Sequence, residues 1–344
     1  MHASHTSHKS QVTSYKSQAT LRTAWEEMPR TETLMNDTLD LKMPTQSLGP
    51  DGPTVSRVAL GCMGLTGTWN PDEFGQTNLR RAIRAFEAAL DVGITFFDHA
   101  DIYGGTTCET AFKECLRAVP GARERIVIAT KCGIRSGHYN LSYDYIHEAI
   151  DRSLDRMGIE YVDLYQLHRP DPLAHPADTA RALNNLVRIG KVRHVGVSNY
   201  FPEQVRALQH YLEVPILSNQ ISISLRRLDP IYSDGTLDQC EAMKMTPMAY
   251  SPLGGGWLSG QRESADDPIL EGTVRELREQ GARCGSTPSQ MAIAWLLAHP
   301  AGIVPLVGSA NPAHIREAAS AAQIRISRED WYRLWVAARG KNVP

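Results

Sequence analysis

The sequence lacks the marks of membrane proteins and of proteins that bind polyanions. Its longest strongly apolar run, residues 291–298, is far shorter than the roughly 20 residues that span a bilayer. The formal net charge is -2, which provides no basic excess to attract a nucleic acid or an anionic lipid surface. The composition therefore predicts a soluble protein that binds neither nucleic acid nor membrane.

The six cysteines follow no motif. They form no CxxC pair, and no signal peptide stands at the N-terminus, so neither a metal site nor a disulfide framework is indicated. We expect reduced thiols, no bound metal and a cytoplasmic location.

A GxGxxG turn, which marks the open sheets that bind dinucleotides, is missing as well. The glycines within residues 61–64 follow an early strand-like run without that spacing and without an immediate helix. This absence disfavours a doubly wound sheet, which is the main alternative among large α/β folds.

The chain has 344 residues, enough for one large α/β domain or for two average ones. Residues 1–38 stand apart, because Ser, Thr, His, Lys and Gln dominate them and no apolar periodicity is present. We predict a disordered N-terminal extension over residues 1–38 and one domain over residues 39–344.

Within that domain, short apolar runs alternate with segments of helical periodicity. Strands are predicted near residues 56–62, 94–98, 126–131, 161–167, 194–198, 216–221, 246–250 and 303–307. Helices are predicted over residues 77–91, 109–118, 143–157, 178–189, 202–211, 235–244, 270–283 and 312–321. Eight such units predict a (β/α)8 TIM barrel, because right-handed βα units close into a ring that leaves no strand edge exposed.

Three further elements are predicted outside the eight units. Strands at 39–43 and 55–60 around a turn at 49–53 predict an N-terminal β-hairpin that closes one end of the domain. Residues 286–290 look like a helix N-cap followed by proline, which predicts an extra helix through His299. A second extra helix is predicted from Ser327 to the C-terminal region.

Polar side chains end most of the predicted strands, where barrel enzymes carry their working groups. The second strand ends at Asp98 and is followed by Tyr103, the third ends at Lys131, and the fourth at His168. Hydrogen-bonding side chains also end the later strands, at Ser198, Asn199, Asn219, Gln220, Tyr250 and Ser251.

Lys131 follows residues suited to a buried strand, so its ammonium needs a carboxylate, and Asp98 on the adjacent strand is the natural partner. A purely structural ion pair is the alternative. Tyr103 favours a catalytic role, because a cation beside a phenol lowers a pKa that begins at about 10. His168 is then suited to orient a substrate carbonyl. His99 is a candidate for a residue that supports Asp98 without contacting the substrate.

This arrangement resembles the aldo-keto reductase superfamily over nearly the whole chain from about residue 39. The matching segments are residues 93–104, 129–131, 167–168, 196–199, 219–220 and 250–253, in the family's order and spacing. Residues 97–105, 234–238 and 340–344 look most like the bacterial YdhF-type oxidoreductase branch.

The resemblance implies a nicotinamide-dependent enzyme that reversibly reduces an aldehyde or ketone, a small-molecule substrate, to the alcohol. It makes Tyr103 the general acid and Lys131 the neighbour that lowers its pKa. It makes Asp98 the partner of that lysine and His168 the residue that orients the substrate carbonyl. It also implies that the cofactor is held by Ser198, Asn199, Gln220, Tyr250, Ser251, Leu253, Gly254, Ser309, His314 and Glu317.

The segment expected at the adenosine phosphate departs from the family pattern. Ser309 matches a phosphate-contacting serine, but His314 stands where the family has an arginine that clamps the 2′-phosphate. Arginine gives a permanent forked contact, whereas histidine is only partly charged near neutral pH. We expect NADP(H) to be favoured with relaxed selectivity, and NAD(H) is the alternative.

The resemblance also allows a second function. The same scaffold resembles the β-subunits of voltage-gated potassium channels, so a redox-sensing or regulatory subunit with slow turnover is the alternative function. Trp69, Tyr139 and Trp257 are candidate walls of a substrate pocket, or else ordinary packing residues. The sequence specifies neither the physiological substrate nor the oligomeric state.

Overall fold

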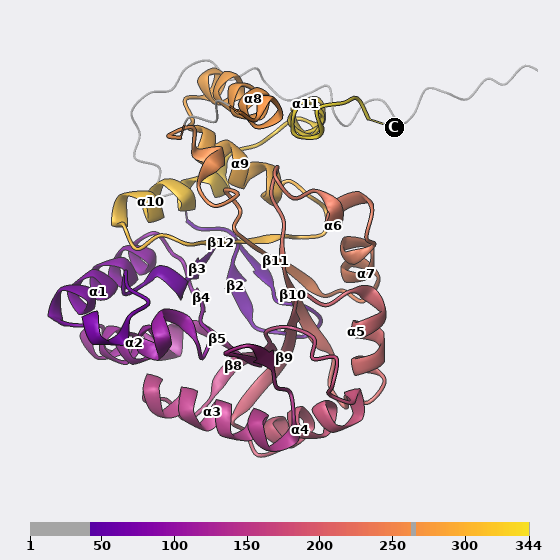
Figure 1. The fold of residues 1–344 in the computed structure, drawn as a ribbon. Coiled ribbons are helices and arrows are strands. Elements are labelled where there is room, and N and C mark those ends of the chain that lie inside the picture. Colours follow the sequence, from indigo (N-terminus) through magenta and orange to yellow (C-terminus); the bar gives the residue numbers. More distant parts are fainter. Residues whose placement is uncertain (1–41, 263–265, 344) are drawn as a thin grey trace, which may run out of the picture. The chain divides into compact units, whose positions relative to one another are not determined.

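The protein folds into a closed barrel of eight parallel strands, seen in a computed structural model that describes residues 42–262 and 266–343 (Figure 1). The barrel strands are β3 (Ala59–Gly61), β4 (Phe96–Asp98), β5 (Val127–Cys132), β8 (Val162–Leu167), β9 (Val192–Ser198), β10 (Ile216–Ser222), β11 (Thr246–Tyr250) and β12 (Val304–Val307). Pairing of β12 with β3 closes the ring. The predicted TIM barrel is confirmed, and the extension predicted over residues 1–38 lies outside the described residues.

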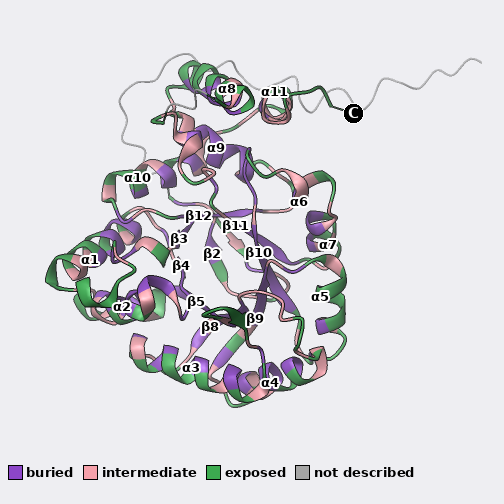
Figure 2. Cartoon of the chain, in the orientation of Figure 1, coloured by how far each residue is buried: buried purple, intermediate pink, exposed green. Residues whose placement is uncertain are grey.

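Helices surround the ring, with their buried faces toward the strands and their exposed faces outward (Figure 2). They are α1 (Gln76–Asp91), α2 (Thr107–Ala118), α3 (Tyr143–Met157), α4 (Pro176–Arg188), α5 (Pro202–Gln209), α6 (Asp229–Tyr232), α7 (Thr236–Ala242), α8 (Pro268–Cys284), α9 (Pro288–Leu297), α10 (Pro312–Ser320) and α11 (Arg328–Arg339). Short 3-10 turns add η1 (Cys62–Gly64), η2 (Pro71–Glu73), η3 (Tyr103–Thr106), η4 (Arg123–Arg125), η5 (Trp257–Ser259) and η6 (Ala321–Gln323). Proline in the first turn begins α4, α5, α8, α9 and α10, where its missing N–H costs no helical hydrogen bond.

The structure corrects which helix lies outside the ring. We predicted two extra helices, and the one predicted from Ser327 is present as α11. The one predicted through His299 is wrong, because α9 packs against β12 and α10 and is the barrel helix between β11 and β12. The other extra helix is α8, which packs against α11 and the outer side of α9 (Figure 1). Because α9 is covered on both sides, it is apolar around its circumference and gives no one-sided periodicity.

The predicted N-terminal hairpin is present, with its strands displaced from the predicted ranges. Its strands are β1 (Thr45–Ser47) and β2 (Thr54–Ser56), and the turn at 49–53 joins them. The backbone N–H of Gly49 donates to Oγ1 of Thr246, at the start of β11, at 2.8 Å. Leu48 and Val55 pack into the barrel interior, so the hairpin closes the end at which the strands begin.

A second, unpredicted hairpin lies at the opposite end, which we call the mouth of the barrel because all eight strands finish there. It consists of β6 (Ile134–Arg135) and β7 (His138–Tyr139), directly after β5. These strands have two residues each, too few to show alternation in the sequence.

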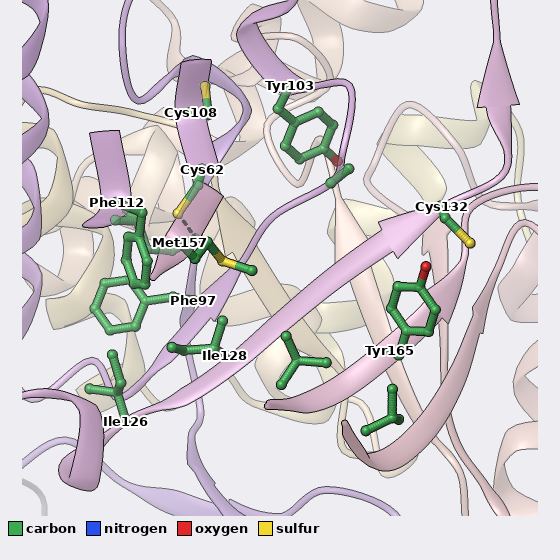
Figure 3. Packing of buried hydrophobic residues seen from close by; sticks show 14 of the residues in the cluster. Cys62, Phe97, Tyr103, Cys108, Phe112, Ile126, Ile128, Cys132, Met157 and Tyr165 are labelled. Carbon is green, nitrogen blue, oxygen red and sulfur yellow. Dashed lines mark hydrogen bonds between the residues drawn. The ribbon is translucent and has the colours of Figure 1, made fainter. Parts of the chain in front are cut away.

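Aromatic packing joins β4 to the first two helices. Phe97 lies 5.0 Å from Phe86 and 5.6 Å from Phe112, measured between ring centroids, and all three are fully buried. Figure 3 shows Phe97 and Phe112 packed together, with Tyr103 apart from them. Burying a side chain of this size stabilises the fold by about 1.5–3 kcal/mol, so this cluster fixes the strand that carries Asp98.

Two findings concern membranes and thiols. Among the described helices, none combines the length and the apolar character that crossing a membrane requires. All six cysteines are free, and five of them are buried. Burial raises the pKa of the Cys115 thiol to about 12, which makes it a poor nucleophile near neutral pH.

We predict that Gly49→Ala destabilises the closed end of the barrel. Gly49 has φ +66°, and a Cβ there lies 2.6 Å from the backbone oxygen of Leu217, which cannot move aside as a side chain can. Denaturant unfolding should show a loss of about 1–3 kcal/mol or more. Gly272→Ala is the control, since its Cβ meets only the end of Arg275 at 3.8 Å. Equal stability of the two variants would contradict the prediction.

Candidate active site

The barrel interior is apolar for most of its depth and becomes polar at the mouth. Along β5, inward-facing residues alternate, so that Val127 and Ala129 are followed by Lys131. The same alternation places Asp98 after Phe96 on β4 and Gln166 after Leu164 on β8. A polar layer therefore covers an apolar one, and both layers are buried.

The centre of this layer is the ion pair predicted between Asp98 and Lys131. Nζ of Lys131 donates to Oδ2 of Asp98 at 2.7 Å, and their side chains are 0% and 2% exposed. Removing one member of a buried pair typically costs about 3–5 kcal/mol, because the other charge is left uncompensated. The two residues are thus interdependent, as the sequence predicted.

Lys131 uses all three of its donors within the site. Besides Asp98, Nζ donates to the backbone oxygen of His99 at 2.6 Å and to the hydroxyl oxygen of Tyr103 at 3.2 Å. An ammonium has three N–H groups and no lone pair, so it cannot accept a proton from the phenol. The hydroxyl hydrogen of Tyr103 must therefore point away from Lys131.

From the sequence we expected Lys131 to lower the pKa of Tyr103, but the pKa in the structure is raised. Burial raises this pKa, Lys131 lowers it, and the charge of Asp98 raises it again, so that the net direction is upward. The sequence indicated the cation but not the depth of burial, which removes the phenolate from water. Tyr103 is consequently a protonated acid at neutral pH in the protein alone.

His168 lies beside Tyr103, with the two rings edge to face at 5.9 Å between centroids. Burial, with smaller contributions from Lys131 and Arg169, lowers its pKa to about 3, so the ring is neutral. Its Nδ1 is buried with no hydrogen-bond partner in the described residues. A neutral ring with one nitrogen sealed inside leaves Nε2 for a group at the mouth.

We did not predict a role for Gln166 from the sequence. It lies two residues after Leu164 on the same strand, so its side chain faces the barrel interior as that of Leu164 does. Gln166 is fully buried, and its Nε2 donates to Oδ1 of Asp98 at 3.2 Å. Space for it comes from Gly196, where a Cβ would lie 3.0 Å from Cγ of Gln166 and 2.4 Å from Oγ of Ser218. The sequence signal for this contact was Gly196 inside one predicted strand together with Gln166 inside the preceding strand.

The predicted cofactor residue Gln220 also contacts Asp98. Its Nε2 donates to Oδ1 of Asp98 at 2.8 Å. A carboxylate only accepts hydrogen bonds, so the amide nitrogen of Gln220 must face it, and the amide oxygen points elsewhere. The side chain thus supports the ion pair while retaining one acceptor for another group.

Ser198, Asn199 and Tyr250 form a connected chain at the mouth. Ser198 Oγ donates to the backbone oxygen of Gln220 at 2.8 Å and accepts from Nδ2 of Asn199 at 2.8 Å. Oδ1 of Asn199 accepts from the Tyr250 hydroxyl at 2.9 Å, and Nδ2 also donates to the backbone oxygen of His168 at 3.2 Å. Asn199 has φ +61°, a conformation that short polar side chains tolerate best. The structure brings these three predicted residues together.

The loop after β11 carries Ser251, Leu253 and a run of three glycines that all have positive φ. A Cβ on Gly254 would lie 2.8 Å from Cδ of Arg226, so this arginine packs directly over the loop. The guanidinium groups of Arg226 and Arg262 lie 5.6 and 5.3 Å from the ring centroid of Trp257. The two arginines were not predicted, because they come from segments separated in sequence.

The remaining predicted residues lie at α10. Oγ of Ser309 and Nδ1 of His314 are 3.4 Å apart, so these two are neighbours. Glu317 instead accepts a hydrogen bond from Oγ1 of Thr287 at 2.6 Å. Arg316 pairs with Asp91 of α1 at 3.4 Å and therefore points away from His314.

The family profile described as "Aldo/keto reductase family" matches residues 57–337. The chain belongs to the aldo-keto reductase family. It is an NAD(P)H-dependent oxidoreductase.

Relatives of this aldo-keto reductase cover most of its length. It is 42% identical over 314 residues to a protein named 6-dehydroglucose reductase from Novosphingobium aromaticivorans, covering 89% of this chain and 99% of that one. It is 37% identical over 306 residues to oxidoreductase YdhF of Escherichia coli, covering 87% and 98%. This similarity confirms the YdhF-type branch.

A solved structure supports the same assignment. The crystal structure of the thermostable aldo-keto reductase Tm1743, in complex with the inhibitor epalrestat, has a TM-score of 0.75 at 28% identity, covering 86% of this chain and all of the other.

Some polar and aromatic residues of this aldo-keto reductase lie outside the cluster around Asp98 and Lys131. Asp101 accepts a hydrogen bond from the hydroxyl of Tyr145 at 3.0 Å, and its backbone N–H donates to the backbone oxygen of Lys131 at 3.0 Å. Trp69 and Tyr139 are 55% and 42% exposed, which is unusual for packing residues of their size. Exposure at the mouth keeps both as candidate walls of the substrate pocket.

We predict that His99 makes the protein sensitive to acid. His99 is fully buried, and burial with a smaller effect of Lys131 lowers its pKa to about 3. The unfolded chain takes up this proton near pH 6.5 and the folded chain does not, so stability is lost as pH falls below that value. His99→Leu should therefore reduce the pH dependence of the unfolding free energy by about 1.4 kcal/mol per pH unit below about pH 6.

Chemical unfolding of the wild type and of His99→Leu at a series of pH values from neutral to acid measures this difference. Asp101, whose pKa burial raises to about 6, acts with the opposite sign in both proteins and cancels in the comparison. Parallel stability curves would mean that His99 titrates normally in the fold.

Proposed function

We propose that the protein reduces an aldehyde to a primary alcohol with NADPH, and that Tyr103 supplies the proton. The observation that carries this proposal is the hydrogen bonding of Lys131. Its three donors are occupied by Asp98, His99 and Tyr103, so the phenol hydrogen of Tyr103 is directed away from the lysine.

Proton transfer in this site depends on the charges of Lys131 and Asp98, which are in place before the substrate binds. Tyr103 donates its proton to the oxygen of the substrate carbonyl as negative charge develops there. The phenolate that remains is stabilised by Lys131, whose pKa is raised because Asp98 and Tyr103 outweigh the opposing effect of burial. Neutral His168 donates from Nε2 to the same carbonyl oxygen and fixes its orientation.

The side chains at the mouth suit the nicotinamide end of a dinucleotide. The cofactor, when bound, supplies the hydride. Gln220 keeps its amide oxygen for a carboxamide N–H, since its nitrogen is held by Asp98. Ser198 and Asn199 are fixed in place by each other and by Tyr250, which leaves the tyrosine ring to lie along the nicotinamide.

Two groups of residues are suited to bind the phosphate groups of the cofactor. Gly254 and its neighbours allow the backbone to approach a pyrophosphate closely, beside the positive charges of Arg226 and Arg262. Ser309 with His314 is suited to a 2′-phosphate, with a weaker charge than an arginine provides. This arrangement favours NADP(H) with relaxed selectivity, with NAD(H) as the second cofactor.

The relatives suggest the first substrates to test. Two proteins named 6-dehydroglucose reductase, from Novosphingobium aromaticivorans and Agrobacterium fabrum, are 42% and 40% identical to this chain, with 99% and 94% of their lengths covered. We propose a sugar oxidised to the aldehyde at its terminal carbon as the substrate class. Simple aliphatic aldehydes are the comparison, because they lack the hydroxyl groups that a sugar site recognises.

Tyr103→Phe should abolish most of the carbonyl reduction while leaving cofactor affinity unchanged. General acid catalysis contributes about 10²–10⁴-fold, so kcat should fall by at least 100-fold. Absorbance of NADPH measures turnover, and quenching of tryptophan fluorescence measures binding. Tyr165→Phe is the control, because Tyr165 is fully buried in the barrel wall and its hydroxyl bonds to the backbone of Ile146. Near-wild-type activity of Tyr103→Phe would exclude Tyr103 as the acid.

His314→Arg should increase the preference for NADPH. A hydrogen bond to a charged group contributes about 1.5–3 kcal/mol, so the ratio of kcat/KM for NADPH to that for NADH should rise roughly tenfold or more. Arg316→Ala is the control, because Arg316 pairs with Asp91 and should leave the ratio unchanged. An unchanged ratio in His314→Arg would place the 2′-phosphate elsewhere, and a strong NADH preference of the wild type would contradict NADP(H).

A further inference from the structure

Gln166 is a buried polar residue in contact with the ion pair at the centre of the site. It is fully buried at the end of β8, and its Nε2 donates to Oδ1 of Asp98 at 3.2 Å. Its Oε1 is also buried and has no hydrogen-bond partner in the described part of the chain. A buried carbonyl without a partner costs stability, and an apolar side chain of similar size would avoid that cost.

Asp98 receives hydrogen bonds from three different strands. Lys131 of β5 occupies Oδ2, whereas Gln166 of β8 and Gln220 of β10 both donate to Oδ1. The two amides approach one oxygen and leave the other for the lysine. Rotation of the carboxylate would break at least one of these contacts.

We propose that Gln166 is a positioning residue for proton transfer. By holding Oδ1 of Asp98, it keeps Oδ2 directed at Lys131 and partly neutralises the carboxylate charge that reaches Tyr103. It acts through Asp98 and Lys131 and does not contact the substrate. The inference rests on the proposed role of Tyr103.

Gln166 and Gln220 differ in their interactions with groups other than Asp98. Gln220 has an amide oxygen available for the cofactor, so its replacement should change both cofactor affinity and turnover. Gln166 is fully buried within the polar layer, beside Gly196 and Ser218, so its replacement should change turnover alone. This difference separates a positioning role from a binding role.

Gln166→Leu is the first test. We expect kcat for reduction to fall roughly tenfold, because the charge-assisted hydrogen bond from Gln166 to Asp98 is lost. The NADPH dissociation constant and the thermal unfolding midpoint should stay close to the wild-type values. In the reverse reaction, alcohol oxidation, the less neutralised Asp98 should move the ionisation of Tyr103 to higher pH. The deficit should then be largest near neutral pH and shrink as the pH rises.

Gln166→Glu is the second test and preserves the shape of the side chain. A protonated glutamic acid can still donate to Asp98, whereas an ionised one repels it. Activity should approach wild type at low pH and fall as the pH rises, with an ionisation that wild type lacks. This variant keeps the proposal testable even if Gln166→Leu folds poorly.

Gln280→Leu is the matched control. Gln280 is 2% exposed, also has a buried Oε1 without a partner in the described residues, and lies on α8, away from the barrel interior. It donates to Glu276 and to the backbone oxygen of Asp330, so its loss should affect stability without altering any pH profile.

The outcomes separate this inference from the proposed function. If wild type reduces aldehydes and Tyr103→Phe does not, but both Gln166 variants keep the wild-type kcat and pH profiles, the positioning role is wrong and the function stands. A uniform loss of activity at every pH, with a lowered unfolding midpoint, would also overturn it and indicate a structural role. If wild type shows no reduction, the proposed function fails first.

Discussion

The buried ion pair between Asp98 and Lys131 is the interaction on which the site depends. Two charges removed from water stabilise a fold only when further hydrogen bonds complete their surroundings. Here those bonds come from two further strands, β8 and β10, and from the backbone of His99. The closed barrel makes this possible, because its inward-facing positions converge on one axis. A flat sheet would place the same residues on a surface, where solvent would weaken each contact.

The polar layer is retained at a cost in stability. His99 and His168 are held neutral by burial, and polar atoms of both rings lack partners in the described residues. Gln166 carries a similar cost. Such exceptions to complete hydrogen bonding are concentrated where charge must be controlled, and apolar packing beneath them, including Phe97 and its neighbours, supplies the compensating stability.

Tyr103 illustrates how position changes chemistry. A lysine beside a phenol favours the phenolate, and that effect is present, but burial outweighs it. The protein alone therefore holds a proton ready for donation, which suits reduction. In the proposed mechanism, the contact between Lys131 and Tyr103 matters most after the proton has left, when the phenolate needs a nearby positive charge.

The sequence by itself determined the barrel and the pairing of Asp98 with Lys131, because strand periodicity and the residues at strand ends are local patterns. The YdhF-type branch followed from the resemblance of residues 97–105, 234–238 and 340–344 to that branch. Only the tertiary structure decided that Gln166 and Gln220 share one oxygen of Asp98, since that contact joins residues on strands far apart in the chain. It also decided that α8, not α9, lies outside the ring beside α11, because a helix covered on both sides loses its one-sided pattern. The upward shift of the Tyr103 pKa likewise depends on burial, which no spacing of residues encodes.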